Sequence, residues 1–507
     1  MVLGRTLGVA LVGLTGHVVE VEAHLAPSLP AFTLVGLPDA SLAESRDRVR
    51  AAVTSSGLAW PNRRITVNLS PATLPKSGSG FDLAIAIATL AGAEAIDPAA
   101  TRDVVHLGEL GLDGRLRPVR GVLPAVAAAV AAGHRRVVVA GANAAEARLV
   151  PGAQVVGASS LAQVAAGYGA SLEVPDVPPV SVDAISARPR AATLDLSEVV
   201  GQPDARACLE VAAAGGHHLL MVGPPGTGKT MLAARLPGLL PDLTEADAVE
   251  VTAVHSVAGA FDPGGGLLRR PPFEDPHHTA TPASVVGGGS GMPRPGAASR
   301  AHRGVLFLDE APEFSTAVLQ TLRQPLEHGE LVLHRAAGTA RYPARFQLVL
   351  AANPCPCGQA VGKGLSCTCR PEQRRRYFGK LSGPLLDRVD LQVELAPSRA
   401  GAAVGESTAT VAARVVGARA AQAERLRGTP WRTNGDVPGG WLRERLGADR
   451  SLVSDLDRAL DRGTLSLRGV DRVLRVAWTL ADLAGRAAPG RADVGQALLL
   501  RTRGHGA

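Results

Sequence analysis

One stretch limits the possible folds of this chain more than any other, because it joins an apolar strand to a helix through a glycine-rich turn. In LLMVGPPGTGKTMLAARL, the loop Gly223–Thr230 lies between these two runs and matches the pattern G-x-x-x-x-G-K-[ST]. Glycines let successive backbone N–H groups surround a phosphate, and the following helix adds its partial positive charge. The stretch therefore predicts a nucleotide-binding α/β domain with a mostly parallel sheet.

We expect the nucleotide to contact this whole phosphate loop, which consists of Gly223, Pro224, Pro225, Gly226, Thr227, Gly228, Lys229 and Thr230. Lys229 is placed to reach the β- and γ-phosphates of ATP, and the hydroxyl of Thr230 to ligate Mg²⁺. The chain has 53 basic residues, and only four of them are lysines. A lysine at the one position that needs a compact cation therefore strengthens the assignment.

A second motif, GVLFLDEAPEF, predicts a buried strand that ends in two carboxylates, Asp309 and Glu310. Ligands bind at the carboxyl ends of the strands in open parallel sheets. We expect Asp309 to hold Mg²⁺ and Glu310 to polarise the attacking water. The motif is informative because it follows a phosphate loop in the same chain.

Three further residues are candidates for sensing the γ-phosphate. The strand-like FQLVLAANP ends in Asn353, whose amide either caps a turn or orients water. Arg388, in LSGPLLDRVDLQVEL, can act in a ring of ATPases as a finger on the neighbour's γ-phosphate. Arg468 begins a helical run and is expected to close on the phosphates of its own subunit.

The order of these motifs resembles that of the AAA+ ATPases, and longer stretches are more specific. The segments DLSEVVGQPDARACLEVAAAGGHHLLMVGPPGTGKT, PHHTATPASVVGGG and NPCPCG closely resemble the Mg-chelatase-like YifB/ComM family, and the similarity covers nearly the whole chain. This resemblance implies an ATPase that uses Mg²⁺ and forms a hexameric ring with ATP at the subunit interfaces. It also implies a DNA-acting helicase or translocase, with branch migration during homologous recombination or natural transformation as its task.

The chain departs from the family pattern at two places. It reads PPFEDPHH, with Glu274 and Asp275, where the family usually reads P-F-R-x-P-H-H. It has Ala297 where an acidic residue is common. Both departures fall in the segment Pro271–Arg300, which is expected to face the pore, and neither alters the ATPase motifs.

In this family a β-hairpin precedes the strand that ends in the asparagine, and it faces the pore. The corresponding segment LVLHRAAGTARYPARF supplies His334, Arg335 and Arg341 as candidates to contact the phosphates of single-stranded or branched DNA. A solvated hairpin without a ligand is the alternative interpretation.

The first part of the chain is similar to the proteolytic domain of Lon in LPKSGSGFDLAIAIATLAG and in the stretch around LDGRLRPVRGVLPAV. The positions of the catalytic serine and lysine in the Lon motif correspond to Gly80 and Leu123, which supply neither a nucleophile nor a base. Ser77 and Ser79 lie nearby with Lys76, but neighbours in a chain point in different directions. We therefore expect a domain that retains the fold without proteolysis and supports ring assembly or DNA engagement.

Four of the five cysteines form two C-x-C pairs, Cys355/Cys357 and Cys367/Cys369. Four thiolates can hold a tetrahedral Zn²⁺, and glycines between the pairs let the loop fold back. An iron–sulfur cluster and unliganded thiols are the alternatives. If the loop holds zinc, we expect it to brace a subunit interface rather than to do chemistry. Cys208 is expected to be a small core residue.

We predict an α/β chain with a parallel-sheet ATPase core and a helical carboxyl-terminal lid. The expected parts are a Lon-like α/β domain (1–170), a Pro-rich linker (171–193), the AAA+ core (194–396) with the cysteine loop (355–369), and the lid (397–507). Helical spacing of apolar residues in RGVDRVLRVAWTLADLAG supports the lid.

Charge and hydropathy narrow the classes of function. The net charge is +7, and from Arg370 onward 24 Lys and Arg face 15 Asp and Glu. This surplus suits either an anionic partner such as DNA or a solvated helical surface. No apolar run reaches the ~18 residues of a membrane helix, so we expect a cytoplasmic protein. The alternative to a DNA motor is an ATPase that remodels a protein or inserts a metal.

Overall fold

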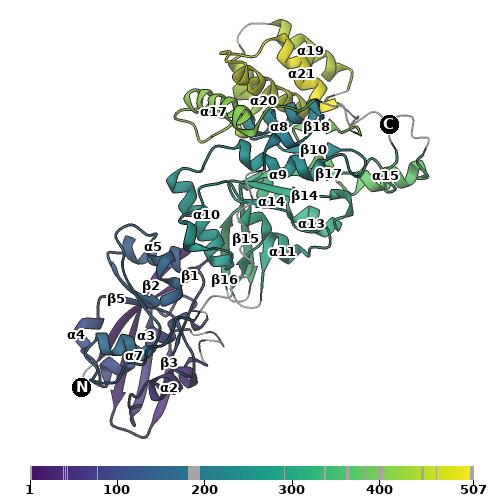
Figure 1. Ribbon diagram of the computed structural model, residues 1–507. Helices are drawn as coiled ribbons and strands as arrows, with labels where there is room; N and C mark the ends of the chain where they lie inside the picture. The colour runs from purple at the N-terminus through teal and green to yellow at the C-terminus, as the bar shows by residue number, and fades with distance from the viewer. Residues whose placement is uncertain are drawn as a thin grey trace.

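The computed structural model shows an elongated molecule, with the amino-terminal domain at one end and the carboxyl-terminal helices at the other (Figure 1). A central domain lies between them. The structure describes residues 3–37, 39, 42, 44–76, 78–180, 194–289, 292–335, 338–360, 366–381, 383–397, 403–446, 450–463 and 465–502.

The amino-terminal domain contains a seven-stranded mixed sheet in the order β3-β4-β2-β1-β5-β8-β9. In β4, Ile65, Val67 and Leu69 are buried, which is the alternation of a strand with one face on a core. The strands of this domain are β1 Gly4–Val12, β2 Thr15–Ala26, β3 Ala31–Val35, β4 Arg64–Ser70, β5 Val104–Leu107, β6 Glu109–Leu110, β7 Leu116–Arg117, β8 Arg136–Ala140 and β9 Gln154–Ala158.

Helix α3 is buried along its whole length, because it packs against both β1 and β2. A side chain at Gly4 would collide with the backbone of this helix, since its Cβ would lie 2.0 Å from the carbonyl oxygen of Ala88. The helices of the domain are α2 Ser45–Ser55, α3 Asp82–Gly92, α4 Pro98–Thr101, α5 Val122–Ala131, α6 Ala144–Ala147 and α7 Leu161–Gly167.

The central domain is built on a parallel five-stranded sheet in the order β11-β14-β17-β10-β18. The segments LLMV, VLFL and LVLAA of its strands are continuous apolar runs, as is typical of a parallel sheet with both faces covered. We call the two ends of this sheet the carboxyl edge and the amino edge, after the strand ends that lie there. The strands are β10 Leu219–Val222, β11 Phe273–Glu274, β14 Val305–Leu308, β17 Gln347–Ala352 and β18 Leu391–Glu394.

Helices and two small hairpins surround this sheet (Figure 1). The hairpins are β12 Gly287–Gly288 with β13 Arg294–Pro295, and β15 Glu330–Arg335 with β16 Gly338–Pro343. The helices are α8 Pro203–Gly215, α9 Lys229–Leu239, α10 Glu245–Ala258, α11 Pro282–Val286, α12 Ala297–Arg300, α13 Thr316–Thr321, α14 Arg323–His328, α15 Pro371–Gly379 and α16 Gly383–Leu386.

The carboxyl-terminal lid is helical, and its apolar face continues the core of the central domain. The face predicted for α20 is confirmed, since Val470, Val473, Leu474 and Ala477 are buried against that core. The helices are α17 Thr408–Arg425, α18 Gly439–Glu444, α19 Arg450–Asp461, α20 Leu467–Leu483 and α21 Arg491–Thr502.

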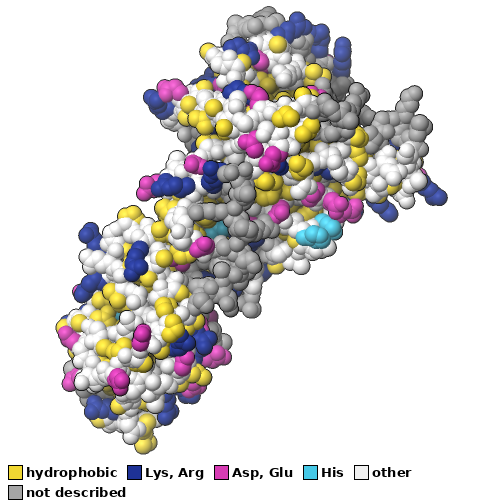
Figure 2. Space-filling view, in the orientation of Figure 1, with side chains coloured by type: hydrophobic (Ala, Val, Ile, Leu, Met, Phe, Trp, Pro, Cys, Tyr) yellow, Lys and Arg dark blue, Asp and Glu magenta, His cyan; other side chains and the backbone are white. Residues whose placement is uncertain are grey.

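Several arginines of the lid form ion pairs with acidic side chains. Lys and Arg side chains are mixed with Asp and Glu on the visible face and form no continuous basic surface there (Figure 2). The ion pairs of this region include Arg414–Glu210, Arg425–Asp482, Arg432–Asp247 and Arg486–Asp493. The surplus alone therefore does not identify a nucleic-acid surface.

The amino-terminal domain contacts the central domain at several places. Helix α5 packs on α10, and the Glu146 carboxylate accepts hydrogen bonds from the Leu123 N–H and the Ser256 hydroxyl. Burial raises the pKa of this Glu146, and the Ser256 and Leu123 donors oppose the effect. The turn between β1 and β2 also touches the β15–β16 hairpin, because a Cβ on Gly13 would lie 2.6 Å from the Arg341 carbonyl oxygen.

Within the described part of the chain, no helix combines the length and apolarity needed to cross a membrane.

Candidate functional site

The phosphate loop follows β10 and leads directly into α9, as the sequence predicts. Gly226 and Gly228 have φ angles of 78° and 89°, a region that side chains other than glycine disfavour. Gly223 is needed for space, because its Cβ would lie 2.8 Å from the Leu395 carbonyl oxygen. The conformation that brings the loop N–H groups together thus depends on its glycines.

The Lys229 side chain lies within the loop, and the residue is buried. It donates to the carbonyl oxygens of Gly223 at 2.6 Å and Pro224 at 3.0 Å, and to Asn353 Oδ1 at 3.1 Å. Burial lowers the pKa of Lys229, while Asp309 and Glu310 oppose that effect. The charge is therefore held between the phosphate loop and the carboxyl ends of β14 and β17.

The expected magnesium ligands also meet here. The Thr230 hydroxyl donates to Asp309 Oδ2 at 2.7 Å, so the first residues of α9 and the end of β14 are in direct contact. The register explains this meeting, because β10 and β14 both pair in parallel with β17 and end at the same edge. A hydroxyl and a carboxylate oxygen are ligands that suit Mg²⁺.

Glu310 follows in the left-handed region, with φ of 50°. Its carboxylate lies 3.4 Å from His278 Nδ1, and the His278 ring packs on His277 with centroids 4.1 Å apart. The sequence analysis gave this histidine no role at the site, although its segment PHHTATPASVVGGG carried the family resemblance. A histidine has no fixed spacing to the strand that carries its partner, so only the folded chain reveals the pair.

Arg388 lies at the opposite edge of the sheet. It precedes β18, and Leu391 of that strand pairs with Leu219 at the start of β10. A strand of this length separates Arg388 from its own phosphate loop by about 10 Å or more. This placement suits contact with another subunit. In this chain the Arg388 guanidinium donates to the Glu327 carboxylate of α14.

In this structure Arg468 does not lie at the phosphate loop of its own subunit, and its expected closing on those phosphates stays a prediction. Its guanidinium lies 4.0 Å from the Asp387 carboxylate, next to Arg388, and its side chain is 80% exposed. The lid is anchored at this amino edge, where Arg501 donates to the Val389 carbonyl oxygen at 3.1 Å. Packing of the lid on the central core therefore turns Arg468 away from its own nucleotide site.

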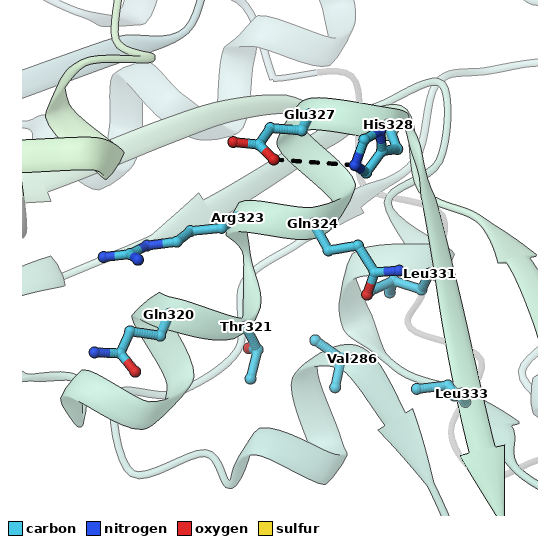
Figure 3. A pocket seen from close by; sticks show the side chains of 9 residues that line it. All are labelled: Val286, Gln320, Thr321, Arg323, Gln324, Glu327, His328, Leu331 and Leu333. Carbon is cyan, nitrogen blue, oxygen red and sulfur yellow. Dashed lines mark ion pairs between the residues drawn. The ribbon is translucent and has the colours of Figure 1, made fainter.

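Two cavities lie near Arg388, which lines one of them. One of ≈ 720 Å³ opens at the amino edge between the central domain and the lid, and Arg388, Arg472 and Arg475 are among its lining residues. The other, of ≈ 430 Å³, lies between α11, α13, α14 and β15 (Figure 3). Glu327 lines both cavities, so the partner of Arg388 sits close to the β15–β16 hairpin.

The β15–β16 hairpin forms as expected and exposes its three candidate DNA contacts, His334, Arg335 and Arg341. The Arg341 guanidinium pairs with the Glu330 carboxylate at 3.2 Å, and its side chain is 68% exposed. His334 Nδ1 lies 3.0 Å from the Thr339 hydroxyl. These contacts leave the side chains at the surface, where either interpretation, DNA contact or solvation, is compatible with their positions.

The four clustered cysteines converge. The Sγ–Sγ distances are 3.3 Å for Cys355–Cys357, 3.6 Å for Cys355–Cys367 and 3.7 Å for Cys357–Cys367, and all four Sγ atoms, including that of Cys369, lie within 4.8 Å of one another. A tetrahedral site with Zn–S bonds of about 2.3 Å requires Sγ–Sγ distances of about 3.8 Å. In an iron–sulfur cluster the thiolates are divided among several irons and stand further apart. The arrangement is therefore compatible with a zinc site.

The Lon-like dyad is not present among the residues that the structure describes. The Lys76 ammonium is buried and donates to the Pro71 carbonyl oxygen, whereas the Ser79 hydroxyl donates to the Glu109 carboxylate. Ser77 lies outside the described residues. The remaining candidate side chains thus have separate partners, and the expected absence of proteolysis stays a prediction.

Family models for magnesium chelatase match most of the chain. The model "Magnesium chelatase, subunit ChlI" matches residues 195–403, "Subunit ChlI of Mg-chelatase" matches 21–143, and "Magnesium chelatase, subunit ChlI C-terminal" matches 405–501. The three segments cover the central domain, the amino-terminal domain and the lid.

Relatives match over nearly their whole length. The chain is 54% identical over 513 residues to an uncharacterized protein of Mycobacterium tuberculosis, with 99% of each chain covered. It is 42% identical over 481 residues to YifB of Escherichia coli, covering 94% of this chain and 92% of YifB. It is 40% identical over 485 residues to the competence protein ComM of Haemophilus influenzae, covering 94% and 93%.

Proposed function

The chain belongs to the Mg-chelatase-like YifB/ComM family of AAA+ proteins, and from this premise we propose that it is an ATP-hydrolysing motor acting on DNA. Its proposed task is branch migration, as a helicase or translocase, in homologous recombination or natural transformation. The family implies ATP and Mg²⁺ as cofactors.

One observation supports both the proposed ATPase activity and the assembly of several subunits. Lys229, Thr230 and Asp309 meet at the carboxyl edge of the sheet, whereas Arg388 and Arg468 lie at the amino edge. A site assembled from both edges needs two subunits, which supports a closed ring. We take six as the number of subunits from the family resemblance.

The residues divide the hydrolysis between them. Lys229 and the loop N–H groups bind the phosphates, and Thr230 and Asp309 would hold Mg²⁺, which neutralises charge on the phosphate oxygens. Glu310 accepts a proton from the attacking water, which Asn353 orients. Arg388 and Arg468 of one subunit approach the γ-phosphate bound by its neighbour.

DNA is assigned to the β15–β16 hairpin, through His334, Arg335 and Arg341. Their side chains are exposed and two of them are guanidinium groups, which bind phosphates without regard to sequence. The amino-terminal domain, residues 1–170, supports this hairpin, because its Gly13 turn touches the backbone of Arg341.

Zinc is proposed as a structural ion at Cys355, Cys357, Cys367 and Cys369, on the strength of their converging thiols. The expected role in bracing a subunit interface stays a prediction. Metal analysis of the purified protein tests the site, with the Cys208→Ser variant as a control that keeps all four proposed ligands.

A motor that remodels a protein or inserts a metal is the second candidate, because the family models that match are those of magnesium chelatase subunits. ATPase turnover with single-stranded, forked and four-way DNA separates the two. We expect DNA to stimulate turnover, and forked or four-way DNA to be unwound or migrated. Turnover that is unchanged by all three DNAs would rule out the DNA motor and favour the second candidate.

A further inference from the structure

The segment between β17 and α15 begins and ends beside the nucleotide site. It starts at Asn353, whose side chain accepts a hydrogen bond from Lys229 at 3.1 Å. It leads into α15, where the buried Tyr377 hydroxyl hydrogen-bonds to the backbone of Asn353. Both ends of the cysteine loop are thus tied to the residue that faces the phosphate-binding lysine.

The first C-x-C pair also touches the phosphate loop directly. The Gly358 N–H donates to the Cys355 carbonyl oxygen at 2.9 Å, which closes a tight turn with φ of 74° at Gly358. A Cβ on Gly358 would lie 2.7 Å from Cδ of Pro225, in the centre of the phosphate loop. The backbone of the cysteine loop therefore packs on the phosphate loop of the same subunit, and only glycine fits there.

Among the described residues of this segment, the four thiols bring its two ends together. Cys355 is fully buried, and its Sγ lies 3.6 Å from Cys367, across a loop that spans both C-x-C pairs. A divalent cation bound by all four thiolates would join the two ends by covalent-strength bonds. Without such an ion, four thiols at these distances are held by weak contacts alone.

We propose that a zinc ion at the cysteine cluster and a nucleotide at the phosphate loop bind cooperatively within one subunit. Zinc holds Gly358 against Pro225 and Asn353 beside Lys229, so the phosphate loop is ordered before the nucleotide arrives. The coupling is reciprocal by thermodynamic linkage, so bound nucleotide retains zinc. This inference rests on the proposed nucleotide and zinc sites and is independent of whether the motor acts on DNA.

The first test measures affinity for a fluorescent ATP analogue with the full-length protein, zinc-loaded and after removal of zinc by a chelator. We expect the Kd to rise by about tenfold without zinc. In the reverse measurement, saturating nucleotide should slow the release of zinc to a chromogenic chelator. Equal Kd values in both states, or a purified protein that holds no zinc, would overturn the proposal.

The second test disturbs the contact between Gly358 and Pro225 while leaving the four cysteines in place. Gly358→Ala adds the methyl group that collides with Pro225, and it should retain zinc while weakening the ATP analogue several-fold. Gly428→Ala is the matched control, because Gly428 has a similar φ of 79° and no atom within 4 Å of an added Cβ. Unchanged affinity in a folded, zinc-containing Gly358→Ala protein would contradict the coupling, even if zinc-free protein cannot be prepared.

The proposed DNA function and the zinc–nucleotide coupling are tested by different measurements, so either can fail alone. If DNA does not change the ATP turnover of the wild-type protein, the proposed DNA function is ruled out, and the zinc–nucleotide coupling is unaffected. If DNA changes the ATP turnover of the wild-type protein, but the protein binds nucleotide equally well with and without zinc, only the coupling is ruled out.

Discussion

The two edges of the central sheet carry different halves of an ATPase. At the carboxyl edge, Lys229 donates to Asn353 at 3.1 Å and Thr230 donates to Asp309 at 2.7 Å. At the amino edge, Arg388 donates to the Glu327 carboxylate, and the Arg468 guanidinium lies 4.0 Å from the Asp387 carboxylate of the same subunit. Under the proposed function, one subunit therefore supplies the nucleotide-binding residues, and a neighbouring subunit supplies the arginines that complete the γ-phosphate environment.

The largest effect is expected at the carboxyl edge. Lys229→Ala removes the cation that bridges the phosphate loop and Asn353, so we expect loss of nucleotide affinity and a fall in turnover of ~10³-fold or more. An equilibrium binding assay and a phosphate-release assay measure both. Turnover that persists in this variant would show that the nucleotide site lies elsewhere.

Arg388→Ala should distinguish the roles of the two edges, because it leaves the nucleotide site of its own subunit intact. We expect turnover to fall by about 10³-fold while nucleotide affinity changes little. Arg427→Ala, an exposed arginine of the lid, is the control and should behave as wild type.

Mixing the two inactive variants tests the trans arrangement itself. In randomly mixed rings about a quarter of the interfaces join an intact nucleotide site to an intact Arg388, so partial turnover should return. If the mixture stays inactive although the subunits exchange, Arg388 does not act across the interface.

Arg468→Ala should have a smaller effect, about tenfold in turnover, because this side chain is largely exposed. Mixed with Lys229→Ala, it should also regain turnover. If this mixture stays inactive while the mixture with Arg388→Ala regains turnover, Arg468 acts on the nucleotide of its own subunit, which it would reach by a movement of the lid.

The smallest effect is expected for His278→Ala, which removes the neighbour of Glu310 at 3.4 Å. We expect turnover to fall about threefold from poorer positioning of the carboxylate, without a change in nucleotide affinity. His278→Gln, which keeps a hydrogen-bond donor, should recover part of the loss. His277→Ala is the control, because His277 packs on His278 but has no contact with Glu310 among the interactions of the described residues. An equal loss in the control would assign the effect to packing.

The predictable parts of the site are those in which a short segment sets its own geometry. The phosphate loop, the strand ending in Asp309 and Glu310, and the strand ending in Asn353 are each local patterns, and the parallel register brings them together. The position of Arg468 could not be predicted, because a helical run indicates the apolar face but not which edge of a distant sheet that face covers. His278 was missed because its partner lies on another element with no characteristic spacing.

The sequence by itself determined the strand–loop–helix phosphate site, the carboxylates of β14, the four-thiol cluster and the family, because glycine conformation, apolar runs and residue spacing act over short distances. Only the tertiary structure decided that Arg388 and Arg468 share the amino edge, and that Gly358 packs on Pro225. Those placements follow from the pairing of β10 with β18 and from the packing of the lid on α8, which join segments far apart in the chain.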